Sequence, residues 1–162
     1  MLRVQMTKRP DGGGVLRCAR ADGSITWQKQ NARHAPFFAL HDLTHFAVEQ
    51  TLGLGRGFFG LIAEGWDMDD LTGKGTRGPL PGEAAEVEYI VGAFDTERAG
   101  ATILTAAEFN EFAATHAASS GRATPRLLTQ EEMARVRARR GQLFSRWHAL
   151  PAGETIELQF EI

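Results

Sequence analysis

The residues best suited to chemistry are His41, His45 and Glu49, each four positions after the one before. Imidazole nitrogens and carboxylate oxygens are common protein ligands of Zn²⁺, and the same groups serve in proton transfer. Residues four apart on a helix lie on the same face. If this stretch is helical, the spacing therefore predicts one polar stripe able to hold a metal ion or to take part in catalysis.

The stretch from Pro36 to Leu52 is typical of a buried helix. Pro36 suits the first turn, and no further proline or glycine occurs before Gly53, which suits a helix end. Apolar residues cover most of the helix circumference, and the polar stripe is narrow, with Asp42 at its edge. Buried ionisable groups need partners. A metal ion would be one such partner, and a buried hydrogen-bond network of the same side chains is the alternative.

Helix geometry limits how many of these residues one ion can bind. His41 and Glu49 are eight residues apart, about 12 Å along the axis, which is too far for one ion with bonds of about 2.1 Å. Two arrangements remain. In the first, His41 and His45 bind the metal, Glu49 orients His45, and another segment supplies a third ligand. In the second, no metal binds and the three side chains form a buried relay. The candidates for the third ligand are, in order of preference, Glu64, His34, Glu86 and His116.

The run His41-Asp42-Leu43-Thr44-His45 resembles the His-Glu-x-x-His helix of the zincin metalloproteases. The resemblance implies zinc as the metal, the two histidines as ligands, and Asp42 as the general base in hydrolysis of a peptide or a small molecule. The sequence departs from that pattern at Asp42, which is one methylene shorter than glutamate, and Glu49 is the other candidate for the base. Residues 37–70 are also similar to conserved bacterial proteins of unknown function.

The composition indicates an ordinary globular protein, with 43% hydrophobic and 23% charged residues. A length of 162 residues predicts a single domain, 1–162. The net charge of −2 predicts no general attraction to nucleic acid or to membranes. The single cysteine, Cys18, excludes an internal disulfide and fits a reducing compartment. The sequence has no apolar run long enough for a signal peptide or a membrane span, so we expect a cytoplasmic protein.

Alternating apolar and polar residues predict strands at both ends of the chain. Residues 2–30 contain three such stretches separated by turn sequences, and residues 156–162 form a fourth, whose acidic residues would pair with the basic early strands. Between them we expect helices over 36–52, 83–98, 105–118 and 129–150, with a short helical turn after Asp67. The sequence therefore predicts an α+β fold: an antiparallel sheet of about four strands, three N-terminal and one C-terminal, packed with four or five helices.

The last predicted helix, 129–150, indicates a function of a different class. Its outer faces carry five arginines, namely Arg135, Arg137, Arg139, Arg140 and Arg146. These side chains could bind a polyanion, or they could pair with the acidic segment 64–97 of the same chain. The alternative to an enzyme is thus a binding or interaction module with a structural His/Glu network and a basic helix face. The net charge makes nucleic acid the less favoured partner.

Overall fold

Three strands at the start of the chain form an antiparallel sheet. In the computed structural model, which describes residues 1–162, they are β1 (Leu2–Lys8), β2 (Gly14–Arg20) and β3 (Ile25–Gln30). Alternate residues of β1 and β2 are buried on one face of the sheet. The alternating apolar and polar residues of the sequence therefore face the core and the solvent in turn.

The last strand, β4 (Thr155–Phe160), completes the sheet by pairing with β1, so the strand order is β3-β2-β1-β4. Glu157 on its outer face lies 3.7 Å from the Arg3 guanidinium and accepts a hydrogen bond of 2.8 Å from the Gln5 amide. The acidic last strand is thus paired with the basic first strand. The predicted α+β class and the sheet of three N-terminal strands and one C-terminal strand are confirmed.

Six helices lie between β3 and β4. The four long helices are α1 (Ala35–Leu52), α4 (Gly82–Gly100), α5 (Ala106–Ser119) and α6 (Gln130–Ala149), and the two short ones are α2 (Phe58–Ala63) and α3 (Met68–Leu71). The sequence predicts four or five helices, and α2 is the additional one, because its six residues are too few to display a helical period. No helix combines the length and the apolar character that crossing a membrane requires.

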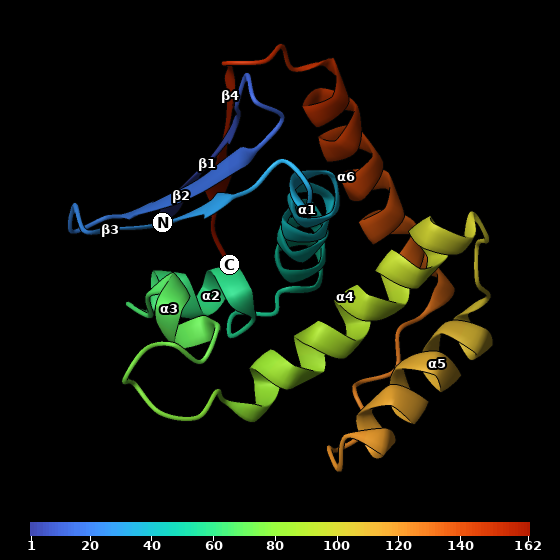
Figure 1. Cartoon of the computed structure of the whole chain (residues 1–162). Coiled ribbons are helices and arrows are strands. Elements are labelled where there is room, and N and C mark those ends of the chain that lie inside the picture. The colour runs from blue at the N-terminus through green and yellow to red at the C-terminus, as the bar shows by residue number, and fades with distance from the viewer.

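Helix α1 lies at the centre of the molecule, between the sheet and helices α4 and α6 (Figure 1). It ends at Gly53, whose left-handed backbone, with φ of 66°, lets the Gly53 N–H bond to the carbonyl of Glu49. Toward the sheet it presents Phe46, whose ring centroid is 5.7 Å from that of Phe160 on β4. The helix is therefore buried along most of its length, as its largely apolar circumference predicts.

The arginine-rich face of α6 finds most of its partners within the chain. Arg137 and Arg140 both pair with the buried carboxylate of Glu97 on α4. Arg139 donates a hydrogen bond to a side chain of α1, and Arg146 donates one to a carbonyl of β4. Only Arg135 of the five is exposed without a hydrogen bond or an ion pair. Glu97 of the acidic segment is therefore the counterpart of two of the five arginines, and α1 and β4 supply acceptors for two others.

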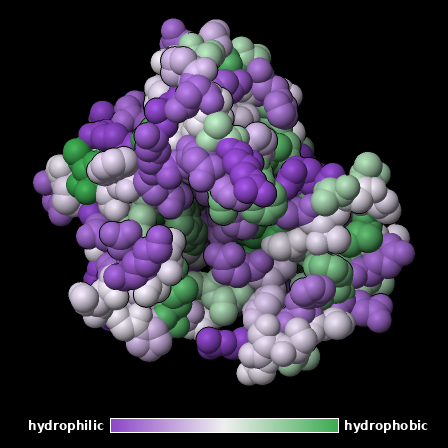
Figure 2. Space-filling model, viewed as in Figure 1, coloured by the Kyte–Doolittle hydropathy of each residue, from purple (hydrophilic) through white to green (hydrophobic).

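Figure 2 shows the molecule from the same side as Figure 1. This face is hollowed near its middle, between the part that carries α2 and α3 and the part that carries α4 and α5. Hydrophilic residues make up much of the surface around the hollow. The surface on this side is therefore concave and largely polar.

Candidate metal centre

His41 and His45 lie one turn apart on α1 with their rings in contact. The ring centroids are 4.8 Å apart, and the planes are nearly perpendicular, at 80°. The side chain of His45 is 2% exposed, whereas that of His41 is 23% exposed. Phe37 stacks on His41, and Phe58 packs against His45, so aromatic rings restrict both imidazoles. The helix thus presents two neighbouring imidazoles, one buried and one partly open to solvent.

Helix α4 brings a carboxylate to this pair. Glu88 Oε1 lies 3.4 Å from His45 Nε2, and one ligand atom each from His41, His45 and Glu88 lie within 4.8 Å of one another. Tetrahedral ligands with bonds of about 2.1 Å are about 3.4 Å apart, so a small inward movement would enclose an ion. Two histidines and a glutamate are a known zinc donor set that leaves a position for water or substrate. These three residues form a group that could hold a metal ion.

Glu49 orients His45 from the side opposite Glu88. Its Oε1 lies 3.1 Å from His45 Nδ1, and its Oε2 accepts a hydrogen bond of 3.0 Å from the backbone N–H of Gly60 in α2. A carboxylate at Nδ1 makes that nitrogen the N–H donor and leaves Nε2 free to bind a metal. Gly57 permits this approach, because a Cβ at that position would lie 2.5 Å from Glu49 Cδ. The start of α2 therefore leaves room for the Glu49 carboxylate at Gly57 and binds it through the Gly60 N–H.

Asp95 makes the equivalent contact with His41. It lies two turns after Glu88 on α4, and its Oδ2 is 2.7 Å from His41 Nδ1. Arg98 pairs with the other Asp95 oxygen at 3.4 Å and lies over the ring of Phe37. Burial by itself raises the pKa of Asp95, but His41 and Arg98 outweigh that effect and lower it. Each histidine therefore has a carboxylate at Nδ1, which keeps its Nε2 available.

The charges around the two imidazoles favour a cation. Burial by itself lowers the pKa of His45, but the carboxylates of Glu88 and Glu49 outweigh it and raise that pKa to about 10. Burial raises the pKa of Glu49, against the opposing effects of His45 and the Gly60 N–H. The pKa of Glu88 is lowered, because the effect of His45 exceeds that of burial. At neutral pH the raised pKa of His45 keeps a proton on its ring, and that proton offsets part of the negative charge of Glu49 and Glu88. A divalent ion bound at Nε2 would displace the proton and take over this neutralising role.

Comparisons with known protein families, curated proteins and solved structures gave no match to this chain. The donor set and its surroundings therefore carry the evidence for a function. The likeness to the zincin helix stays confined to the five residues from His41 to His45.

Asp42, predicted as a general base, points from α1 toward the sheet. Its Oδ2 accepts a hydrogen bond of 2.7 Å from the side chain of Gln30, at the end of β3. Burial raises the pKa of Asp42 to about 6, although the charge of His41 and the hydrogen bond from Gln30 act in the opposite direction. In this position the carboxylate joins the helix to the strand.

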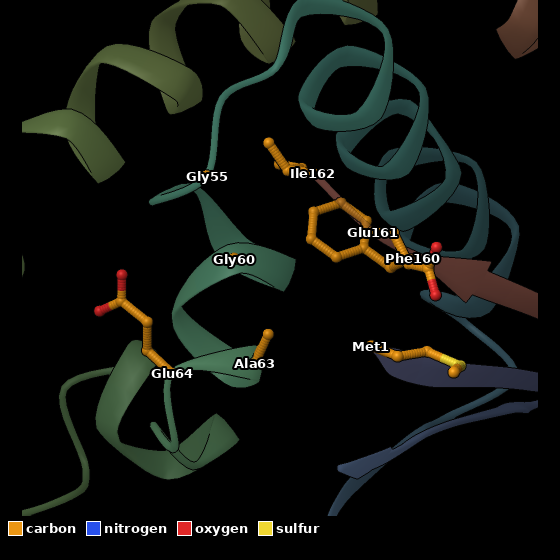
Figure 3. A pocket seen from close by; sticks show the side chains of 8 residues that line it. All are labelled: Met1, Gly55, Gly60, Ala63, Glu64, Phe160, Glu161 and Ile162. Atoms are coloured by element: carbon orange, nitrogen blue, oxygen red, sulfur yellow. The ribbon is translucent and has the colours of Figure 1, made fainter. Parts of the chain in front are cut away.

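Glu64, predicted as the third ligand, lies in a different part of the fold. It follows α2, is exposed, and pairs with Arg56 at 3.2 Å. It lines a cavity of about 510 Å³ between α2, the N-terminus and the end of β4, and Figure 3 shows its carboxylate directed away from the other labelled side chains. None of His41, His45 and Glu88 lines this cavity. The position beside the two histidines is taken by Glu88.

The remaining candidates for the third ligand have other surroundings. Glu86 accepts a hydrogen bond of 2.8 Å from the backbone N–H of Arg126. His34 is exposed at the start of α1, and His116 is exposed near the end of α5. None of the three belongs to the group that could hold a metal ion.

Glu88 and Asp95 are not among the site residues that the sequence predicts. They are seven residues apart in one predicted helix, so they lie on the same side of it, flanking the buried Val91. Acids at this spacing beside an apolar face are a signal that could have identified the pair. The sequence does not show, however, that this side of α4 packs against α1.

Proposed function

We propose that this protein binds a divalent metal ion at His41, His45 and Glu88 and uses it in hydrolysis, with zinc the best-suited ion. One observation carries the proposal: the ligand atoms of a zinc donor set converge, and a separate carboxylate contacts the second nitrogen of each histidine. Histidine placed between a metal and a carboxylate is characteristic of metal sites.

The residues of the centre have separate roles in this proposal. Nε2 of both histidines and the Glu88 carboxylate would hold the ion, while Glu49 and Asp95 would maintain the tautomers that expose those nitrogens. A bound divalent ion supplies Lewis acidity to a hydrolytic reaction. The side chain of Glu88 is 51% exposed and that of His41 is 23% exposed, so the solvent side of the group is open to a substrate.

The zincin resemblance supports zinc and hydrolysis through the histidine pair alone. Asp42 occupies the place of the zincin general base in the sequence, but its carboxylate is engaged with Gln30. Both oxygens of Glu49 are also engaged, one with His45 and one with Gly60. We therefore assign neither residue as the proton acceptor. The substrate we propose is a small molecule or a peptide, since a net charge of −2 does not favour nucleic acid.

Metal analysis of protein purified without a histidine tag tests the proposal. We expect about one zinc ion per chain, or uptake of about one by the metal-free protein, and a rise in unfolding temperature with zinc because the ion binds the folded state. The His41→Ala/His45→Ala double variant should lose both effects. Iron in place of zinc would replace hydrolysis by oxygen chemistry, since two histidines and a carboxylate also bind Fe(II). Absence of bound metal and of any metal-dependent shift would overturn the proposal.

The same double variant separates a metal site from a purely structural network. A structural network predicts that the parent is more stable than the variant by about 3 kcal/mol or more, with or without zinc, because a buried carboxylate loses its partner. A metal site predicts that much of the difference appears only when zinc is present. Chemical denaturation of both proteins, with zinc and with chelator, measures the two differences.

A further inference from the structure

A second cavity lies beside the candidate metal centre. It has a volume of about 340 Å³, opens between α4 and α5, and has Glu88 in its wall. The other lining residues are Tyr89, Gly92 and Thr96 of α4, and Phe112 and His116 of α5. The volume is at the lower end of the roughly 300–1,000 Å³ typical of ligand pockets, so it suits a small molecule. Glu88 therefore borders both the metal group and this cavity.

Three polar groups of the cavity are hydrogen-bond acceptors, and a fourth, the Tyr89 hydroxyl, can donate or accept. His116 donates its Nδ1–H to the Phe112 carbonyl at 3.1 Å, which leaves Nε2 as the acceptor of the neutral ring. The Thr96 hydroxyl donates to the Gly92 carbonyl at 3.0 Å, so its oxygen offers lone pairs to the cavity. Glu88 adds a carboxylate, whose second oxygen would stay open to the cavity while the first holds the metal, and no lysine or arginine lines the cavity. The lining therefore favours a ligand that brings donors or a positive charge, and it disfavours an anion.

Aromatic rings and a glycine shape the rest of the cavity. Phe112 and His116 stack with ring centroids 4.1 Å apart, and Tyr89 of α4 adds a third ring to the lining. Aromatic faces attract ammonium groups and pack against flat apolar groups. Gly92 lies within α4, where glycine is less stable than alanine, yet a Cβ there would meet no atom within 4 Å. Packing within the fold thus does not require this glycine, and its missing side chain keeps the cavity open.

We propose that this cavity is the substrate subsite of the metal centre, and that it selects small molecules carrying an ammonium or another donor group on an aromatic or apolar body. The inference rests on the proposed function, because it assigns the cavity to the reaction at the neighbouring metal group. Glu88 joins the two as their shared wall. His116 Nε2 and the Thr96 hydroxyl oxygen are the acceptors that determine specificity for the donor group.

A titration in the presence of zinc, followed by nuclear magnetic resonance, tests this selection without requiring activity. The probes are phenethylamine and 3-phenylpropionate, which share a hydrocarbon body and differ in the charge of the head group. We expect phenethylamine to shift the amide signals of Gly92, Thr96 and His116 with a dissociation constant on the order of millimolar, and 3-phenylpropionate to bind at least roughly tenfold more weakly. Equal binding of the two probes, or shifts confined to other residues, would overturn the proposal.

A variant that fills the cavity tests whether phenethylamine binds there. Gly92→Leu places a side chain in the open space and favours the helix, so it should fold and weaken phenethylamine binding at least about tenfold. Gly92→Ala is the matched control and should bind the amine nearly as well as the parent. Unchanged amine binding by Gly92→Leu would overturn the location of the subsite.

Zinc binding is measured separately on the parent and on both glycine variants. A parent that binds zinc but not phenethylamine would overturn the cavity inference and leave the proposed function standing. A parent that binds phenethylamine but not zinc would overturn the proposed function, and with it the assignment of the cavity as a substrate subsite. Binding of both, with only the amine affected by Gly92→Leu, is the result we expect.

Discussion

Glu49 Oε1 lies 3.1 Å from Nδ1 of His45, one turn earlier on α1, while Glu49 Oε2 accepts the backbone N–H of Gly60. One buried carboxylate therefore links the short helix α2 to the candidate metal centre. Gly57, which caps the start of α2, has no side chain to accept a hydrogen bond, so Glu49 supplies an acceptor for the first turn of that helix. The same carboxylate can thus both hold α2 in place and orient a histidine. A substitution that displaces the Glu49 carboxylate but keeps it in the chain tests its role in orienting His45.

Gly57→Ala should weaken metal binding. The new Cβ would lie 2.5 Å from Glu49 Cδ, which is closer than atoms approach, so the carboxylate must move away from its present position beside His45. Loss of a supporting carboxylate typically lowers metal affinity by roughly 10–100-fold. Competition with a chelator measures the change. Gly82→Ala, where a Cβ meets nothing within 4 Å, is the control, and equal affinities in the two variants would mean that Glu49 does not orient His45.

Glu88→Gln should remove most of the metal affinity, and Glu64→Gln should not. Glu88 Oε1 lies 3.4 Å from His45 Nε2, whereas Glu64 lies just after the end of α2 and pairs with Arg56. Replacing the carboxylate by a neutral amide removes a charged ligand, so we expect at least about a hundredfold loss of zinc affinity. Calorimetric titration of both variants measures it. The opposite ranking would return the third-ligand role to Glu64.

The sheet and the central helix could be predicted because their signals are local. Alternation over Leu2–Lys8 and Thr155–Phe160 reports the buried face directly, and Pro36 and Gly53 bracket α1 through backbone requirements. Helix α2 offers no such signal, because six apolar residues can be buried in either kind of element. Its position matters for the site, since its first turn binds the Glu49 carboxylate.

The third ligand depends on tertiary structure in a way that the sequence does not reveal. Glu64 stands out as the one acid in an apolar stretch, but it lies just after α2 ends, where it reaches solvent and Arg56. Glu88 resembles an ordinary surface acid until α4 is packed against α1. The direction of the Asp42 side chain also depends on tertiary structure. Adjacent residues on a helix point about 100° apart, so its direction, toward the histidine site or toward the sheet, depends on how α1 is rotated.

Arg137→Ala should destabilise the protein, whereas Arg135→Ala should not. Arg137 pairs with Glu97, whose side chain is 3% exposed, and the remaining partner, Arg140, is 3.6 Å from that carboxylate. The backbone N–H of Leu104 also donates to Glu97, at 3.0 Å. Removing one of the two cationic partners of this buried carboxylate should lower the free energy of unfolding by about 2–3 kcal/mol. The exposed Arg135 should change it by less than about 0.5 kcal/mol. Urea denaturation measures both values.

The same pair of variants tests the interaction-module alternative. A functional basic face would require arginines that are free to bind a polyanion, and Arg135 is the one without an internal partner. We expect weak binding of RNA that Arg135→Ala barely alters. Tight binding that falls steeply with salt and is weakened in Arg135→Ala would instead favour the interaction module.

The buried thiol of Cys18 predicts a loss of stability at high pH. Burial, followed by the negative charge of Asp42, raises the pKa of this thiol from 9.0 to about 12. A raised thiol pKa means that the fold favours the protonated form. The contribution to stability is therefore complete below about pH 9 and is lost as the pH rises toward about 12. Between about pH 8 and pH 11, the parent should lose roughly 2–3 kcal/mol more of its free energy of unfolding than Cys18→Ala loses.

Urea denaturation of the parent and Cys18→Ala at several pH values measures this difference in slope. The smaller side chain lowers the stability of the variant at every pH by creating a cavity, so the comparison uses the change with pH rather than the absolute values. Other groups that titrate in this range are present in both proteins, and their effects cancel in the comparison. Parallel stability curves would show that the thiol ionises as readily in the folded protein as in the unfolded chain. The thiol is fully buried, so native protein should also resist alkylation by iodoacetamide near neutral pH.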